Sequence, residues 1–222
     1  MPLYTDNYHK IVKEISKNKI ILVAVSKTKP KEDITALIQL GQIDFGENYV
    51  QELVDKHDHL PSDIHWHFIG HLQSNKVKYI APFVYLIHGV DSMKLLKEIN
   101  KQAEKCDRVI NCLLQVHIAQ EETKFGMDEN DLAVVKTIIP ELKNVSILGL
   151  MGMASFSDDV KKVREEFRYL KSLFDKFSPS SIDNIPWSVL SMGMSGDYQM
   201  AIEEGSTMVR IGSLLFGPRM DN

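Results

Sequence analysis

The chain has 222 residues, of which 44% are hydrophobic and 25% are charged, as in an ordinary soluble globular protein. Its 26 basic and 30 acidic side chains give a formal net charge of -4, which disfavours nucleic acid as a partner and favours a small ligand. The N-terminal residues lack an apolar signal core and no stretch nears the length of a membrane span, so we expect a cytoplasmic protein with no membrane partner. Two cysteines, Cys106 and Cys112, are too few for a disulfide framework, and we expect both to be reduced.

Short apolar runs alternate with amphipathic segments along the chain, a pattern typical of repeated strand and helix units around a parallel sheet. The expected strands are 20–26, 43–47, 65–70, 85–90, 110–118, 146–153, 188–192 and 208–216. The expected helices include 31–40, 92–105, 128–139, 159–177 and 197–204, with a further helix before the first strand. Eight such units predict an α/β fold, a single (β/α)8 TIM barrel that occupies residues 1–222.

An open doubly wound sheet is the alternative fold. That fold usually carries a glycine-rich phosphate-binding turn directly after its first strand. The corresponding segment of this chain, from Ser26 to Pro30, contains no glycine. The barrel is therefore the favoured architecture.

Lys27 follows the first expected strand, in which six apolar residues stand in a row from Ile20 to Val25. Such a strand is covered on both faces, so we expect the ammonium group at its tip to face the interior. Burial disfavours the charged form and lowers the pKa of a lysine, and a neutral amine can form a Schiff base with an aldehyde. The alternative is a strand-end lysine that only reaches water.

A second group of informative residues lies in segments 188–197 and 208–213, around the last two expected strands. Barrels often bind phosphate with the loops after strands seven and eight, where backbone amides and a short helix converge on the anion. We expect the helix near Asp197 to contribute the positive end of its dipole. Gly193 and Gly196 allow close approach of the backbone to a ligand. Hydroxyl groups are offered by Ser191, Ser195 and Ser213. The alternative is a pair of ordinary glycine turns capped by serines.

Arg210 lies within a nearly unbroken apolar strand, where a guanidinium group is costly unless it has a partner. A closed barrel brings its first and last strands side by side, so Lys27 and the phosphate-binding turns become neighbours. A ligand with an aldehyde for the lysine and a phosphate for the turns is pyridoxal 5′-phosphate (PLP). Arg210 would then face the pyridine nitrogen and, because it keeps its proton, weaken the ring as an electron sink. The alternative role for Arg210 is a buried ion pair with a carboxylate.

Five motifs in order resemble the pyridoxal phosphate homeostasis proteins, and the resemblance runs from the first expected strand to the C-terminus. The motifs are VAVSK at 23–27, FGENYVQE at 45–52, WHFIGHLQSNK at 66–76, SMGMSGD at 191–197, and GSTMVRIG at 205–212 with FGPR at 216–219. The resemblance implies a barrel like the N-terminal domain of alanine racemase, with the PLP cofactor held as an aldimine on Lys27. The cofactor-binding positions that it implies are Lys27, Asn48, Ser191, Gly193, Ser195, Arg210, Gly212 and Ser213.

The same resemblance implies that Glu47 and Gln51 support the pocket. Two features depart from the family pattern. His117 stands where an asparagine is expected, which puts a polar contact at that position in question, and the loop 155–159 is less typical.

The family's implied role is that of a PLP carrier or buffer in intracellular PLP homeostasis, without robust catalysis of its own. A racemase needs two bases on opposed faces of its substrate, and related racemases take the second, a tyrosine, from an additional β domain. The sequence ends at Asn222, soon after the last expected strand, so we expect no such domain, and Tyr49 is the one tyrosine close to the expected site. We expect a monomer that contacts PLP-dependent apoenzymes transiently. A weak PLP-dependent amino-acid racemase remains the alternative.

A metal-dependent barrel hydrolase is a further alternative. His65 and His67 share one face of an expected strand, as a barrel metal centre requires. Further histidines at or near strands are His71, His88 and His117. Such a hydrolase also needs a carboxylate ligand at a strand end, for which Asp91 is the one candidate, so we expect hydrogen-bonding histidines and no metal. Two acidic pairs, Asp44 with Glu47 and Glu121 with Glu122, have no identifiable partner site for sugar chemistry.

Overall fold

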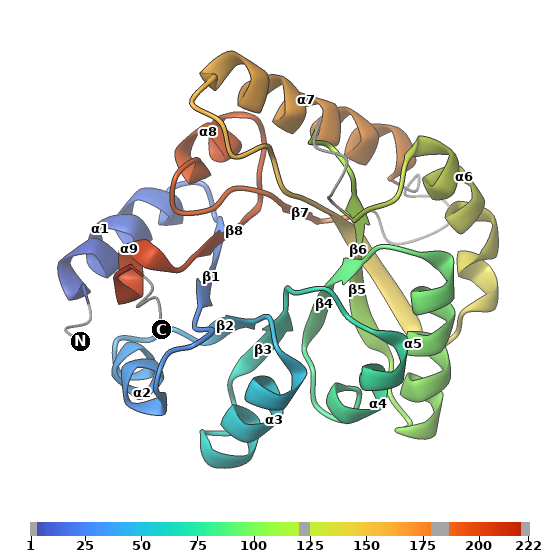
Figure 1. Ribbon diagram of the computed structural model, residues 1–222, viewed down its shortest axis with the longest axis horizontal. Helices are drawn as coiled ribbons and strands as arrows, with labels where there is room; N and C mark the ends of the chain where they lie inside the picture. Colours follow the sequence, from blue (N-terminus) through green and yellow to red (C-terminus); the bar gives the residue numbers. More distant parts are fainter. Residues whose placement is uncertain (1–3, 120–124, 179–186, 219–222) are drawn as a thin grey trace.

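Eight parallel strands form a closed barrel in chain order, and β1 pairs with β8 to complete it (Figure 1). This computed structural model describes residues 4–119, 125–178 and 187–218. The strands are β1 (Ile21–Val25), β2 (Asp44–Glu47), β3 (His65–Phe68), β4 (Leu86–Val90), β5 (Ile110–Val116), β6 (Val145–Gly152), β7 (Val189–Ser191) and β8 (Met208–Ile211). The predicted (β/α)8 barrel is confirmed.

Helices surround the barrel on its outside, as the view in Figure 1 shows. They are α1 (Thr5–Ser16), α2 (Lys31–Gln39), α3 (Val50–His59), α4 (Val77–Ile80), α5 (Met93–Lys105), α6 (Glu129–Ile138), α7 (Val160–Phe177), α8 (Tyr198–Glu203) and α9 (Ser213–Phe216), with 3-10 turns η1 (Ser74–Lys76) and η2 (Ile139–Glu141). The expected helix before the first strand is α1. Within the described ranges, no helix combines the length and the apolar character needed to cross a membrane.

The last strand is shorter than predicted. The prediction ran from 208 to 216, whereas β8 ends at Ile211 and the chain turns into α9. The turn forms because the N–H groups of Leu215 and Phe216 both donate to the carbonyl oxygen of Gly212. The apolar residues of 214–216 therefore pack as a short helix instead of extending the sheet.

Interior residues of the barrel alternate along each strand with residues that face the helices. One interior layer is apolar and consists of Val23, Leu86, Leu113, Met151, Val189 and Met208. Two residues further along four of these strands, the buried side chains are polar, namely His88, Gln115, Ser191 and Arg210. The barrel therefore has an apolar floor and a polar layer above it, toward the carboxyl ends of the strands.

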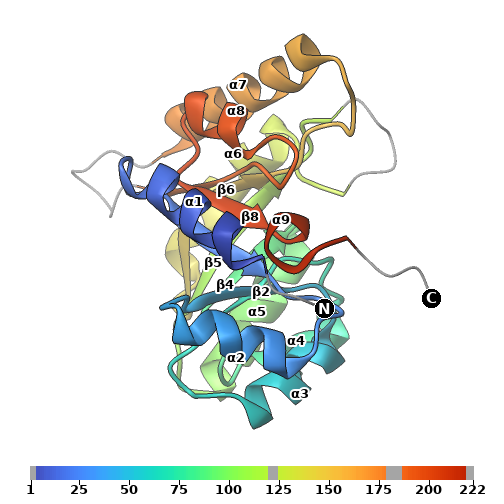
Figure 2. The same cartoon turned by 90° about the vertical axis from the view of Figure 1, so that its left-hand side faces the viewer.

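The first and last helices lie side by side outside β1 and β8, as Figures 1 and 2 show. The N–H of Tyr4 donates to the carbonyl of Leu215 over 3.0 Å, and the Asn7 amide donates to the carbonyl of Leu214 over 3.0 Å. These bonds tie α1 to α9. They fix the turn that follows β8, which borders the site described below.

Phe45 tests the packing between the barrel and its helices. Its side chain is fully buried and contacts the ring of Trp66, with ring centroids 6.1 Å apart. Replacing Phe45 with Ala leaves a cavity, and we expect the free energy of unfolding in urea to fall by about 3–5 kcal/mol. The matched control, Phe156→Ala, removes a fully exposed ring and should change it by no more than about 0.5 kcal/mol. Equal losses in the two variants would contradict this packing.

Candidate functional site

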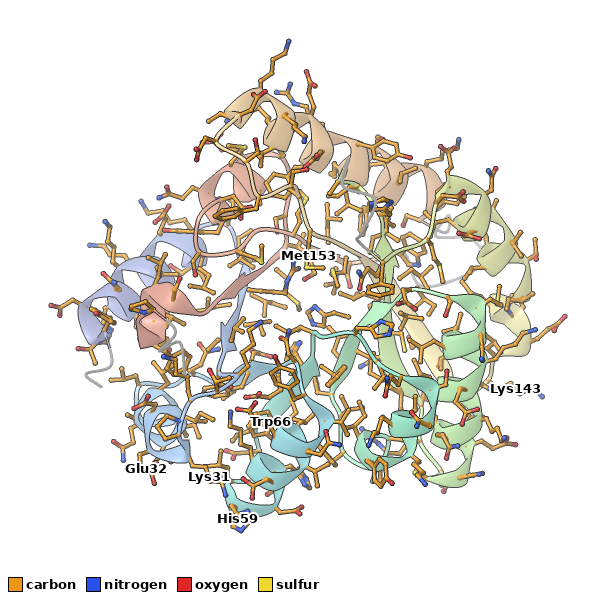
Figure 3. All side chains as sticks on the ribbon, in the orientation of Figure 1. Lys31, Glu32, His59, Trp66, Lys143 and Met153 are labelled. Carbon is orange, nitrogen blue, oxygen red and sulfur yellow. The ribbon has the colours of Figure 1, made fainter. Side chains whose placement is uncertain are left out.

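A cavity of about 420 Å³ opens at the carboxyl ends of β1, β7 and β8. Its lining consists of Val25, Lys27, Lys29, Asn48, Ile69, Met153, Phe156, Met194, Ser195, Gly196, Asp197, Arg210, Gly212, Ser213 and Gly217. Figure 3 shows Met153 near the centre of the barrel, whereas the labelled Glu32, His59 and Lys143 lie at its periphery. Six of the eight predicted site residues line this one cavity.

Lys27 lies two residues beyond the end of β1, on the cavity wall, and is half-buried. Its position at the tip of the first strand is as predicted. A second lysine, Lys29, also lines the cavity, but its ammonium group donates to the carbonyl of Phe216 over 2.9 Å. That bond ties Lys29 to the last residue of α9. Lys27 lies closer to the tip of β1, and this position makes it the better candidate for bonding to a ligand.

The backbone on both sides of Lys27 is held by a buried polar network. Ser26 donates its hydroxyl to Glu47 Oε1 over 2.6 Å, and Lys56 Nζ donates to the same oxygen over 2.7 Å. Lys56 also donates to the carbonyl of Ser26 over 2.8 Å. On the other side, the N–H of Thr28 donates to Glu52 Oε1 over 2.6 Å, and Glu52 pairs with Lys56. The network fixes residues 26 and 28, and so fixes the direction in which Lys27 leaves the strand.

Sequence reasoning found only part of this network. Glu47 bonds to Ser26 and Lys56 beside Lys27, whereas Gln51 is exposed on α3. Lys56 was missed. The available signal was a lysine on the buried face of α3, one helical turn after Glu52 and in line with Leu53.

Burial raises the pKa of Glu47, and the cation and hydrogen bond of Lys56 act in the opposite direction. The second carboxylate oxygen, Oε2, is buried and has no hydrogen-bond partner in the parts of the chain that the structure describes. The ionised form of Glu47 is therefore dependent on Lys56.

Arg210 is buried in the polar layer and borders the cavity from below. Its Nη1 donates to the carbonyl and to the hydroxyl of Ser191 over 2.9 and 2.6 Å, and its Nη2 donates to the carbonyl of Gly152 over 3.0 Å. Burial lowers the pKa of Arg210 to about 10, against the opposing charge of Asp197. Arg210 is therefore still a cation at neutral pH. The hydrogen bonds of Arg210 go to a hydroxyl and to carbonyls, and Asp197 acts on the guanidinium through its charge.

Two of the predicted phosphate-binding residues do not line the cavity. Ser191 is fully buried beneath it, and its hydroxyl is already engaged by Arg210 and lies 3.1 Å from His88 Nδ1. Gly193 forms the turn behind the cavity with φ of +94°, and a Cβ there would lie 2.6 Å from Cβ of Ala201. Both residues lie behind the cavity wall, and their contact with a phosphate stays a prediction.

The remaining turn residues are arranged together on the cavity wall. The N–H of Gly212 donates to the hydroxyl of Ser195 over 3.3 Å, which joins the loop after β7 to the turn after β8. A Cβ on Gly212 would lie 3.3 Å from Cβ of Val25, so the absence of a side chain lets β1 and β8 approach closely at this level. Ser213 follows at the start of α9. Hydroxyl groups and backbone amides of this kind suit an anionic group such as phosphate.

The side-chain oxygen of Asn48 indicates that a polar ligand fits the cavity. It lines the cavity, and its Oδ1 is buried without a hydrogen-bond partner among the described residues. A buried oxygen left unpaired costs free energy, so a ligand with a donor or bridging group at this wall would remove the penalty. The residues present therefore fit a ligand that combines an aldehyde, a ring and a phosphate.

The expected pair of histidines faces a carboxylate. His65 Nδ1 and His67 Nε2 lie 3.1 and 2.9 Å from the same oxygen of Asp44, as the shared strand face predicted. Across residues 4–119, 125–178 and 187–218, no three His, Cys, Asp or Glu side chains are grouped to hold a metal ion. His71 pairs instead with Asp91 over 3.0 Å at the protein surface.

The two features that depart from the family pattern lie at the ends of β5 and β6. His117 is half-buried, and its backbone N–H donates to the carbonyl of Met127. In the loop 155–159, the backbone and hydroxyl of Ser155 both donate to Glu166, which leaves Phe156 exposed at the cavity edge. The acidic residues Glu121 and Glu122 lie outside the described residues.

Residues 4–220 match the family model for the alanine racemase N-terminal domain. The pyridoxal phosphate homeostasis protein of Aquifex aeolicus (strain VF5) is 44% identical over 199 residues, which cover 89% of this chain and 86% of the relative. The chain belongs to the pyridoxal phosphate homeostasis protein family. The family member of Homo sapiens is 39% identical over 211 residues, covering 89% of this chain and 76% of the relative. The predicted resemblance is confirmed.

Solved structures agree with this family assignment. PipY of Synechococcus elongatus PCC7942, described with PLP bound, matches with a TM-score of 0.85 and 31% identity over 96% of this chain and 100% of PipY. The alanine racemase of Clostridium difficile 630 matches with a TM-score of 0.75 and 12% identity over 99% of this chain and 56% of the racemase, a likeness that shows the fold alone. The family shares its barrel with the N-terminal part of alanine racemases.

Lys56 tests the network that holds the lysine loop. In Lys56→Met the Glu47 carboxylate is buried without its cation, and we expect the free energy of unfolding to fall by about 3–5 kcal/mol at neutral pH. The substitution raises the pKa of Glu47 further, so the folded variant binds a proton before the unfolded chain does as the pH falls. Folding of the variant is then favoured by acid, and its deficit relative to wild type should shrink between about pH 7 and about pH 5.

Urea unfolding at the two pH values measures this deficit. The matched control is Lys31→Met, which breaks an exposed pair with Asp55 and should cost about 0–1 kcal/mol at either pH. A Lys56→Met deficit that does not change with pH would show that Glu47 does not carry the unpaired charge.

Proposed function

We propose that the cavity binds PLP through a covalent bond to Lys27, and that the protein acts as a carrier or buffer for this cofactor. The observation that carries the proposal is the convergence of three groups on one cavity. These are the lysine after β1, the Gly212 and Ser213 turn after β8, and the buried cation of Arg210 between them. The PLP named in the description of the PipY structure supports the same ligand.

Each group has a role set by its surroundings. When bound, PLP supplies an aldehyde that condenses with a primary amine, with loss of water, and a pyridine ring that can act as an electron sink. Lys27 provides the amine, and the hydroxyls of Ser195 and Ser213 with the nearby backbone provide the phosphate contacts. Asn48 offers its unpaired Oδ1 to the polar substituents of the ring. Ser191 and Gly193 support these groups from behind.

Arg210 sets the character of the bound ring in this proposal. A guanidinium that faces the pyridine nitrogen donates a hydrogen bond and does not give up its proton at neutral pH. The ring nitrogen then stays unprotonated, and the ring is a weak electron sink. This environment favours holding the cofactor over removing protons from amino acids.

A carrier role also agrees with the lining of the cavity. No tyrosine is part of that lining in the described residues, and Tyr49, the candidate second base, is exposed beside it. The relatives are named homeostasis proteins. We therefore rank weak racemisation below cofactor storage and delivery.

We further propose that the protein works as a cytoplasmic monomer that meets PLP-dependent apoenzymes transiently. Free cysteines support a reducing compartment: Cys106 and Cys112 are unpaired, and burial raises the pKa of the Cys112 thiol. All of the groups that we assign to PLP come from one chain, so no partner subunit is required to complete the cavity.

The site of covalent attachment tests the proposed binding. Protein incubated with PLP and reduced with borohydride should carry the added mass on the peptide that contains Lys27, as measured by mass spectrometry. Lys27→Ala should lose the label together with the visible absorption band of the bound cofactor. Lys29→Ala is the matched control, because it removes the other cavity lysine and should keep both signals. Labelling of Lys29, or equal labelling of scattered surface lysines, would contradict the assignment of Lys27 as the residue that bonds to PLP.

Exchange of the α-proton of amino acids tests the absence of robust catalysis. PLP-loaded protein incubated with L-alanine and several other amino acids in deuterated water should show no exchange or racemisation beyond that of free PLP, because the ring that faces Arg210 is a weak electron sink and no tyrosine lines the cavity in the described residues. Proton NMR and chiral chromatography measure exchange and racemisation. Rapid exchange by wild type that disappears in Lys27→Ala would establish the racemase alternative instead.

A further inference from the structure

A continuous chain of hydrogen-bonding side chains crosses the barrel interior and ends at Arg210. Asp44 Oδ1 lies 2.9 Å from His67 Nε2, and His67 Nδ1 lies 2.9 Å from His88 Nε2. His88 Nδ1 lies 3.1 Å from the hydroxyl of Ser191, which accepts a bond of 2.6 Å from Arg210 Nη1. The chain begins on β2, passes through β3 and β4, and crosses the barrel to β7 and β8.

With both imidazoles neutral, as burial favours, the two ends of this chain fix the direction of every bond in it. Arg210 can only donate, and an aspartate carboxylate can only accept. His67 therefore carries its proton on Nε2 and presents Nδ1 as an acceptor, so His88 also carries its proton on Nε2. The free Nδ1 of His88 accepts from Ser191, whose lone pairs are left to face Arg210. All donors point from Arg210 toward Asp44.

The two histidines are neutral in this arrangement. Both are fully buried, and burial lowers the pKa of each. His67 faces Asp44, His65 and the ring of Tyr85, and of these the carboxylate opposes the effect of burial. His88 also faces His67 and Arg210, and the positive charge of Arg210 lowers the pKa of His88 further. A neutral pair with one proton each is what the one-way chain of bonds requires.

We propose that Asp44 is a positioning residue for Arg210, and that it acts through the fixed tautomers of His67 and His88 and the hydroxyl of Ser191. Asp44 lies at the start of β2, while the cavity lies at the carboxyl ends of the strands. Its effect on the cavity is therefore indirect. The consequence for PLP rests on the proposed function, whereas the tautomers are a property of the ligand-free protein.

Without the acceptor oxygen of Asp44, the direction of the hydrogen bonds along the chain is no longer fixed. His67 can then carry its proton on Nδ1, and His88 can make the same change of tautomer. The hydroxyl group of Ser191 is then free to rotate, and its lone pairs need not face Arg210. The guanidinium keeps its bonds to the carbonyls of Ser191 and Gly152 but loses its fixed orientation toward the cavity. We expect PLP to bind about 10- to 100-fold more weakly in Asp44→Ala, the range for one hydrogen bond to a charged group.

Nitrogen-15 NMR of the ligand-free wild-type protein tests the tautomers without any substitution. His67 and His88 should both be neutral with the proton on Nε2 at neutral pH. A proton on Nδ1 of either ring, or an imidazolium at either position, would overturn the proposal. In Asp44→Ala the two rings should change tautomer or average between tautomers.

Matched variants separate positioning from general damage. Asp44→Asn can present its Oδ1 as an acceptor and should restore the Nε2 tautomers and most of the PLP affinity. His65→Ala removes the half-buried imidazole that also contacts Asp44, and should leave the tautomers and the PLP affinity unchanged. Asp55→Ala removes an exposed carboxylate on α3 and should likewise have no effect.

The outcomes distinguish this inference from the proposed function. If wild type binds PLP and Asp44→Ala binds it equally well with unchanged tautomers, Asp44 does not position Arg210. If wild type binds no PLP but shows the expected tautomers that Asp44→Ala disrupts, the hydrogen-bond chain stands and the proposed function falls. Equal loss of affinity in Asp44→Asn and Asp44→Ala would show that the acceptor oxygen is not what matters, and would overturn the proposal.

Discussion

The pairing of β1 with β8 is the constraint on which the site depends. In their register Val23 lies opposite Arg210 and Ala24 opposite Ile211, so the chain just past each strand emerges at the same edge of the barrel. Lys27 and the Gly212 turn, which lie far apart in sequence, become walls of one cavity. The absence of a side chain at Gly212 allows this close approach, and the bonds from α1 to α9 hold the turn from outside. A barrel that failed to close would keep both motifs but lose the cavity.

Buried polar groups inside the barrel and between β2 and α3 support the cavity at a cost in stability to the core. Buried charges and imidazoles stabilise a fold little, and an apolar layer of similar volume would serve stability as well or better. Here they form two hydrogen-bond networks that reach the cavity from different sides. The network of Glu47 and Lys56 holds the backbone at Lys27, and the chain that ends at Ser191 holds Arg210. Each network orients one functional group, Lys27 or Arg210, by holding the residues that contact it. The polar layer therefore lies directly below the cavity.

Much of this arrangement could be predicted from the sequence because it depends on local patterns. Apolar runs located the strands, and the two glycine-containing segments marked the turns after the last two strands. The extension of β8 to residue 216 was wrong because an apolar run does not distinguish a strand from a short packed helix. The burial of Ser191 beneath the cavity was not predicted, because position along the chain does not reveal depth. The contact between His88 and Ser191 joins β4 to β7 across the barrel, and no spacing in the sequence encodes a contact of that kind.

The most direct test of the central claim is a crystal structure of the wild-type protein soaked with PLP. The account predicts continuous electron density from Lys27 Nζ to the cofactor, with the phosphate beside Ser195, Gly212 and Ser213 and the ring nitrogen facing Arg210. Cofactor density at another part of the barrel, or a phosphate far from the turn after β8 with no bond to Lys27, would contradict it.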